Sequence, residues 1–271
     1  MTRMGIMLAI PPLAAETIFH IGRFPVFNTY INSSIVLVLF LVLGLVLRKK
    51  SKEVPGRLQN FVESIIEVIL DYMDRVTKDR RRSLKFLPIV GTLFLFILVS
   101  NWIGIFPGIG SVGRWLSVHG KPELVPLFRP ANTDLNMTLA MAVLGVALSH
   151  IFGIAAIGFF RYANKFVKLG DIWHSFKKGG MNIFVAFVEF GVGLIEIISE
   201  IAKMVSLSLR LFGNVFAGEV LLTVIAGLAA FVIPLPFVML EILVGFIQAM
   251  VFSILVLVFL TMATAELQEA H

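Results

Sequence analysis

Residues 181–231 read MNIFVAFVEFGVGLIEIISEIAKMVSLSLRLFGNVFAGEVLLTVIAGLAAF, a stretch without proline that is apolar along nearly its whole length. A continuous helix of this length would measure about 75 Å at about 1.5 Å per residue, whereas the hydrocarbon core of a bilayer is about 30 Å thick. The segment must therefore be steeply tilted or broken. It also carries charged residues, among them Arg210, which is flanked by leucines.

The composition of the whole chain agrees with a membrane location. Of its 271 residues, 58% are hydrophobic and 15% are charged, and the mean hydropathy is +0.94, which is typical of an integral membrane protein. The absence of cysteine excludes disulfides, thiolate metal sites and a cysteine nucleophile. We expect neither a metal nor a cofactor, because the histidines lack the spacing of metal ligands. They are His20, His119, His150, His174 and His271.

Four more apolar segments are long enough to cross a bilayer. They run from about Tyr30 to Leu47, Phe86 to Phe106, Asp134 to Phe160 and Phe237 to Ala263. The sequence IPLP precedes the last of them and breaks the helix, which predicts a helical hairpin over residues 181–263. Residues 55–79 instead combine an apolar stripe with charged residues, which predicts an amphipathic helix on the membrane surface.

The predicted fold is an all-α integral membrane protein. It has about five membrane-crossing helices and one amphipathic interfacial helix, and the last two crossings form a long, strongly tilted hairpin. We treat residues 1–271 as one membrane domain. Residues 48–85 contain eleven Lys and Arg and residues 161–178 contain five, but residues 107–133 contain only three. The positive-inside rule therefore places the N-terminal segment 1–29 outside and the C-terminus in the cytoplasm.

The net charge of +6 has a related explanation. Most basic residues flank the predicted spans, so we interpret them as an orientation signal and expect no nucleic-acid partner. The N-terminal sequence MTRMGIMLAIPPLAAE has weak features of a signal peptide, but Pro11 and Pro12 interrupt its apolar run. We therefore expect that this segment is retained.

A polar stripe follows the long helix. Residues seven apart return to nearly the same azimuth, so Glu196, Lys203 and Arg210 share one face. Glu219 is nine residues beyond Arg210, which places it on the opposite face and about 13 Å further along. Small and polar residues lie beside the stripe: Ser199, Ser206, Asn214 and Ala217.

The returning helix carries a second stripe, made of Glu241, Gly245, Gln248 and Phe252. In an antiparallel hairpin this stripe would place Gln248 near Arg210 and Glu241 near Glu219, because the two intervals are similar in length. The Gln248 carboxamide would then form a hydrogen bond with the guanidinium and fix its direction.

Simpler roles account for part of this pattern. Lys203 can extend its charged end to the membrane surface. Arg210 has no such explanation, because a guanidinium stays charged and costs at least about 2.5 to 3.5 kcal/mol at mid-membrane depth. An ion pair with Glu219 is disfavoured by their opposite azimuths, so we expect a functional role for Arg210. The small residues of the hairpin are typical of a helix-packing seam; they are Gly213, Ala217, Gly227 and Ala230.

Three segments together resemble subunit a of the F-type ATP synthase, in its bacterial form. They are PANTDLNMTLAMA, SLSLRLFGNVFAGE and LEILVGFIQAMVFSILVLVFL, and the resemblance extends from about Phe27 to Glu266. In that family two long, inclined helices embrace a ring of rotor subunits c, which would account for the long apolar helix. The resemblance implies the c-ring, the peripheral-stalk subunit b, the remaining synthase subunits and membrane lipid as partners, in the bacterial plasma membrane.

The resemblance also implies roles for individual residues. Arg210 matches the essential stator arginine, which faces the ionisable carboxylate of the rotor and favours its deprotonation. Asn214 and Gln248 match the polar neighbours of that arginine. Glu219 and Glu241 match a polar pair that lines the half-channel from the outside.

Further residues fall on the borders of the two implied half-channels. Asp134 and Asn136 match an element beside the outer access path, and Glu196 and Ser199 fall in the cytoplasmic half-channel. A proton would enter by one half-channel, ride the ring and leave by the other, while the fixed charge of Arg210 blocks a direct leak. Each translocated charge would supply about 2.3 kcal/mol per 100 mV of membrane potential.

The chain is not expected to be catalytic by itself. It contains no GxxxxGK[ST] motif, so nucleotide chemistry would belong to partner subunits. Two other classes of function remain open from the residues. An autonomous ion-coupled carrier would use broken helices around a midplane pocket. The long stretch without proline argues against a broken helix and therefore against a carrier. If the chain were only a structural scaffold, the free-energy cost of placing the charged Arg210 side chain in the membrane would have no explanation.

Overall fold

The computed structural model describes residues 11–50, 52, 54–106, 112–118, 121–166, 180–228 and 233–265. Within these residues, five helices are long and apolar enough to cross a membrane. They are α1 (Asn28–Lys50), α3 (Arg80–Ile105), α4 (Leu135–Ile157), α7 (Gly180–Leu228) and α8 (Pro234–Ala265). The amphipathic segment forms the separate helix α2 (Arg57–Thr77), and a short helix, α5 (Phe159–Phe166), follows α4. This confirms the predicted all-α membrane architecture.

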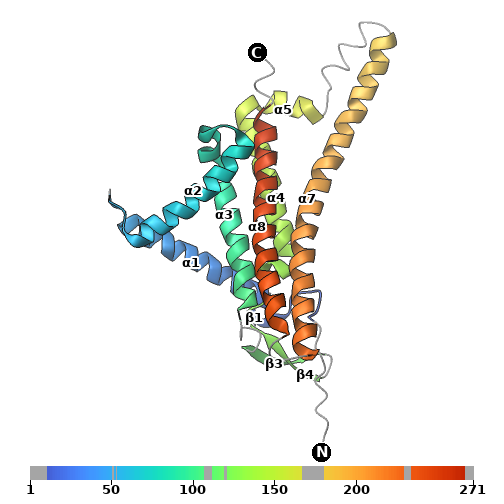
Figure 1. Cartoon of the computed structure of the whole chain (residues 1–271). Coiled ribbons are helices and arrows are strands. Elements are labelled where there is room, and N and C mark those ends of the chain that lie inside the picture. Colours follow the sequence, from blue (N-terminus) through green and yellow to red (C-terminus); the bar gives the residue numbers. More distant parts are fainter. Residues whose placement is uncertain are drawn as a thin grey trace, which may run out of the picture.

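The long apolar stretch is one unbroken helix. α7 has 49 residues, and it leans away from α4 and α8 toward its N-terminal end (Figure 1). Of the two alternatives that its length left open, the structure therefore shows the tilted helix. α8, with 32 residues, begins at Pro234, where the fixed φ of proline suits the first turn of a helix.

The core of the bundle lies between α3, α4, α7 and α8, and α8 packs against each of the other three. Gly145 of α4 permits a close approach to α8, because a Cβ at this position would lie 2.8 Å from Cγ2 of Val256. The first span, α1, differs from the others, since little of its surface is buried. It diverges from the bundle in Figure 1.

The junction between α2 and α3 is held by polar contacts. Lys78 ends α2 in the left-handed conformation with φ 55°, and the Asp79 side chain accepts a hydrogen bond from the backbone N–H of Arg81 to begin α3. The Thr77 and Ser83 hydroxyls lie 2.7 Å apart and are both buried. Leu70 and Met73 of α2 are buried as well, so its apolar stripe faces the bundle.

Two short β-hairpins occur in segments that the sequence analysis left without regular structure. β1 (Thr17–Ile21) pairs with β2 (Phe24–Phe27), and β3 (Gly113–Val118) pairs with β4 (Lys121–Pro126), both antiparallel. Gly22, at φ 64°, supplies the left-handed residue in the first turn. β1, β3 and β4 lie at one end of the bundle, and α2 and α5 lie toward the other (Figure 1).

Candidate functional site

The polar stripe of α7 lies on the outside of the helix bundle. The opposite face of α7 packs into the core through Leu207, Leu211 and Val215. The buried Ser208 hydroxyl on that face lies 3.1 Å from the Thr138 hydroxyl of α4. The stripe itself points away from these contacts; its exposed members are Ser199, Ser206, Arg210, Asn214 and Ala217.

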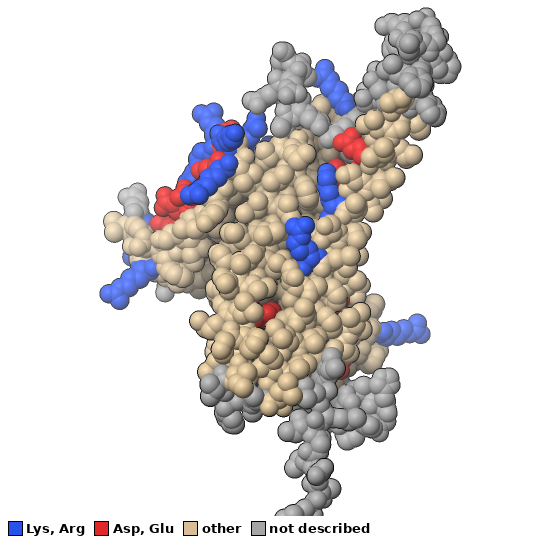
Figure 2. Space-filling view, turned by 45° about the vertical axis from the view of Figure 1, so that its right-hand side comes forward, with Lys and Arg blue, Asp and Glu red and all other residues tan. Residues whose placement is uncertain are grey.

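Arg210 is an exposed cation on an apolar helix surface. In the part of the chain that the structure describes, its guanidinium has no hydrogen bond and no ion pair. Leu209 and Val205 beside it are 50% and 44% exposed. The face in Figure 2 is largely uncharged over its middle, where only isolated charged side chains interrupt it, and basic and acidic side chains gather at its upper left. Within the described residues, no acidic side chain neutralises the charge of Arg210.

The expected hydrogen bond between Gln248 and Arg210 is absent. Gln248 is half-buried on α8, and no hydrogen bond joins it to Arg210 in the described chain. The stripe of α8 instead packs inward on two neighbours. Gly245 lies against Asn101 of α3, whose Nδ2 donates to the Gly245 carbonyl at 3.3 Å, and Glu241 lies against α7.

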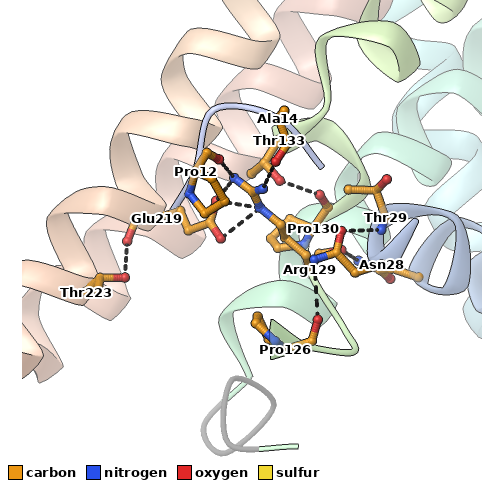
Figure 3. Close-up of polar contacts among 11 residues, drawn as sticks. Pro12, Ala14, Asn28, Thr29, Pro126, Arg129, Pro130, Thr133, Glu219 and Thr223 are labelled. Carbon is orange, nitrogen blue, oxygen red and sulfur yellow. Dashed lines mark hydrogen bonds and ion pairs between the residues drawn. The ribbon is translucent and has the colours of Figure 1, made fainter. Parts of the chain in front are cut away.

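Glu219 does not pair with Arg210, as the helical geometry predicted. It pairs instead with Arg129 (Figure 3). Arg129 donates from Nε to Oε1 and Oε2 of Glu219 at 3.1 and 3.2 Å, and from Nη2 to Oε2 at 3.0 Å. The Arg129 side chain is 1% exposed. This bidentate pair, in which the guanidinium is buried and the Glu219 side chain is 19% exposed, joins the loop before α4 to α7.

The sequence analysis missed Arg129. It is one of only three basic residues in the stretch 107–133, and it stands directly before Pro130, where the segment PANTDLN begins. The available signal was a basic residue directly beside that segment, in a loop that contains few charged residues of either sign. The position of its partner, 90 residues further along the chain, was not readable from local spacing.

Glu241 approaches the same turn of α7 from α8, which confirms the expected neighbourhood of Glu241 and the Glu219 region. Its carboxylate lies against the Cα of Gly218, in the space that a side chain at this position would occupy. Glu241 is 8% exposed. No hydrogen bond or ion pair to its carboxylate occurs among residues 11–50, 54–106, 121–166, 180–228 and 233–265.

Asp134 and Asn136 begin α4 at the same end of the bundle. The Asp134 carboxylate accepts from the Asn136 backbone N–H at 2.9 Å and from its Nδ2 at 3.2 Å, which caps the helix. Its second oxygen accepts from the Thr29 hydroxyl at 3.3 Å. Asp134 is buried and Asn136 is exposed, so the pair lies between the start of α1 and the bundle surface.

The other end of the stripe contains a second group of charges. On α7, Ser199 lies one turn and Glu196 two turns before Lys203. Lys203 donates to Oε1 of Glu200 at 2.7 Å and lies 5.3 Å from the ring centre of Phe259. Nε2 of His150, from α4, is 3.7 Å from the other oxygen of Glu200. Lys203 is therefore anchored on its own helix, in addition to the snorkelling that its length allows.

The predicted small-residue seam has no packing partner among the described residues, so it stays a prediction. A Cβ at Gly213 would meet no atom within 4 Å, Ala217 and Gly227 are exposed, and Ala230 lies outside the described residues. Close helix contact occurs instead at Gly145 and Gly218, because these glycines lie on the inner faces of α4 and α7.

Chemically, the arrangement offers proton-accepting groups at both ends of α7 and a fixed cation between them. Glu219 and Glu241 lie toward the end with the hairpins, and Glu196 and Glu200 lie toward the end with α5. Within the described ranges, no group of three or more His, Asp and Glu side chains is placed to hold a metal ion. A carboxylate can bind and release a proton where no fixed cation holds it in the ionised form.

Comparison with known proteins gives a consistent result. The family model described as "ATP synthase A chain" matches residues 30–261. The chain is 33% identical over 244 residues to ATP synthase subunit a of Trichlorobacter lovleyi, which covers 90% of this chain and 89% of the relative. It is 34% identical over 237 residues to ATP synthase subunit a of Geobacter sulfurreducens (88% and 86% covered) and 32% identical over 244 residues to that of Moorella thermoacetica (90% and 93% covered).

Proposed function

Because the chain belongs to the ATP synthase A chain family, we propose that it is the stator subunit through which protons reach and leave the rotor of a rotary ATP synthase. The subunit binds no nucleotide. It conducts protons between the two sides of the membrane and the carboxylates of a c-ring, and this flow turns the ring and drives ATP synthesis in partner subunits.

The observation that carries this proposal is the position of Arg210. It is a permanent cation on the exposed, apolar face of α7, and the described chain supplies no partner for it. A cation in such surroundings is costly unless an anion meets it there. A rotor carboxylate that arrives, loses its proton beside Arg210 and moves on provides that anion repeatedly.

Two offset half-channels complete the proposal. Glu219 and Glu241 line the outer one, with Asp134 and Asn136 at its border. The cytoplasmic one is lined by Glu196 and Ser199. Asn214, one turn after Arg210 on the same exposed face, and Gln248, on α8, are the remaining polar groups of the path.

The fixed charge of Arg210 separates the two half-channels. A neutral, protonated carboxyl can cross lipid with the turning ring, whereas an ionised one needs a counter-charge. A free proton moving directly between the half-channels would have to pass the guanidinium and is repelled. Protons therefore cross only by riding the ring, and each charge contributes about 2.3 kcal/mol per 100 mV.

The distribution of basic residues supports one orientation of the subunit in its membrane. The basic residues of α2, of the start of α3 and of α5 lie toward one end of the bundle, which the positive-inside rule assigns to the cytoplasm of a bacterial plasma membrane. The N-terminal segment and the hairpins then lie outside. The c-ring lies against the exposed face of α7, and subunit b and the other synthase subunits complete the assembly.

Reconstitution tests this function against its two alternatives. Proton flux is measured in liposomes that contain the chain alone, the chain with its c-ring and the remaining synthase subunits, and the same complex with Arg210→Ala. We expect coupled flux only in the complete, unaltered complex. Substrate-coupled flux by the chain alone would favour a carrier, and coupled synthesis that is unaffected by Arg210→Ala would contradict the proposal.

A further inference from the structure

The contacts of Arg129 distinguish the two outer carboxylates, Glu219 and Glu241. Arg129 is buried, and Glu219 provides its carboxylate partner through three N–H···O contacts of 3.0 to 3.2 Å. A guanidinium keeps its charge at any relevant pH. The buried cation therefore needs the ionised form of Glu219 at all times.

The remaining donors of Arg129 bind the chain's N-terminal segment (Figure 3). Nη1 donates to the Ala14 carbonyl at 3.2 Å, and Nη2 donates to the Pro12 carbonyl at 2.8 Å. The backbone of Arg129 is held as well, because Nδ2 of Asn32 on α1 donates to its carbonyl at 3.0 Å. The guanidinium is thus fixed between α7, the loop before α4 and the N-terminal segment.

Proton uptake by Glu219 would leave this buried cation without a counter-charge. Breaking a buried ion pair from one side is strongly destabilising, because the remaining charge is neither solvated nor paired. A proton carrier gains and loses a proton in every transport step. If Glu219 were that carrier, each step would include the free-energy cost of leaving the Arg129 charge unpaired. Glu219 is consequently unsuited to the role of proton carrier.

Glu241 has the opposite surroundings. It approaches the same turn of α7 at Gly218, it is 8% exposed, and no cation or hydrogen-bond donor of the described chain holds its carboxylate. Two further acidic residues at this end have contacts of their own. The Asp134 carboxylate accepts from Thr29 and Asn136, and the backbone carbonyl of Glu16 accepts from the N–H of Asn28. No hydrogen bond or ion pair between Asp134 and Arg129 occurs in the described chain.

We infer that Arg129 is a positioning residue that holds Glu219 as a fixed counter-charge, and that Glu241 alone takes up and releases the proton on the outer side. The inference rests on the proposed function and divides its outer half-channel into an anchored and an exchanging carboxylate. A proton passes from outer water to the Glu241 carboxylate and from there to a rotor carboxylate. Arg129 and Glu219 keep their charges throughout.

The test uses the complete synthase in liposomes and five variants of this chain: Arg129→Met, Arg129→Lys, Glu219→Gln, Glu241→Gln and the double variant Arg129→Met/Glu219→Gln. ATP synthesis driven by a proton gradient is measured per assembled complex, over a series of pH values in the compartment that faces the hairpins. Arg129→Met and Glu219→Gln each leave one charge of the contacting pair without its partner. We expect each single variant to lower the rate of ATP synthesis about tenfold.

The double variant decides the matter. We expect it to return to within about threefold of the unaltered rate, because it removes both charges together, and to regain the unaltered pH profile. Arg129→Met alone should shift that profile, since Glu219 is then released, whereas Arg129→Lys should preserve it. Glu241→Gln should abolish synthesis in every background.

Other results would overturn the inference. A double variant as inactive as Glu219→Gln alone, or an unshifted profile in Arg129→Met, would make Glu219 a proton carrier. If the single variants fail to assemble, the rate and profile of the double variant alone give the answer. Failure of the proposed function would look different, because Glu241→Gln and Arg210→Ala would then both leave synthesis intact.

Discussion

The carboxylate of Glu241 on α8 occupies the space beside Gly218 of α7 that any larger residue would fill. α7 and α8 run side by side at this point (Figure 1), and Gly218 is the residue before Glu219. The absence of a side chain at 218 is what allows a carboxylate of one helix to reach the backbone of the other.

Gly218→Ala should therefore displace Glu241 and lower proton-driven ATP synthesis. The added methyl group overlaps the carboxylate, and forced overpacking typically costs about 1–3 kcal/mol. Synthesis rates of the purified complex in liposomes measure the effect. Gly44→Ala on α1 is the matched control, because a Cβ there meets no atom within 4 Å. Equal rates for the two variants would contradict the contact.

Arg210→Ala should abolish proton-driven ATP synthesis without preventing assembly. The substitution removes an exposed side chain that has no partner in the described chain, so the packing of α7 stays intact. Synthesis and the amount of assembled complex are measured together. Arg161→Ala, at an exposed arginine of α5, is the control that loses the same charge away from the stripe. A normal rate with Arg210→Ala would remove this arginine from the mechanism.

Ser208→Ala should affect stability more than transport. The variant breaks the buried hydrogen bond to Thr138, which joins α4 to α7, and such a loss costs about 0.5–1.5 kcal/mol. Thermal unfolding of the detergent-solubilised complex measures the change. Ser206→Ala lies on the exposed face of α7 and should leave the melting temperature unchanged. If Ser206→Ala lowered the melting temperature and Ser208→Ala did not, the face of α7 that carries Ser206 would be the packed one, which would contradict the structure.

Lys203→Ala should lower coupled proton pumping only mildly. Its ion pair with Glu200 is partly exposed, and such pairs are worth about 0–1 kcal/mol. ATP-driven acidification of liposomes measures pumping, with Arg210→Ala as the reference for complete loss. An effect of Lys203→Ala as severe as that of Arg210→Ala would assign the lysine a direct role in proton transfer.

The sequence determined the architecture because hydrophobicity and helical period are local properties. Five apolar segments predicted five spans, and all five occur as helices. The spacing of nine residues placed Arg210 and Glu219 on opposite faces of α7, and the structure has one exposed and the other in contact with the loop before α4. The two short β-hairpins escaped prediction, since their strands have only five, four, six and six residues.

The partners of the charged residues were decided by tertiary structure alone. Arg129 and Glu219 are 90 residues apart, and the expected bond between Arg210 and Gln248 does not form, because the stripe of α8 turns toward α3 and α7 instead of toward the exposed face. Helical spacing gives the azimuth of each residue on its own helix. The rotation and offset of one helix against another follow from the packing of the whole bundle, so contacts between distant segments cannot be read from either segment by itself.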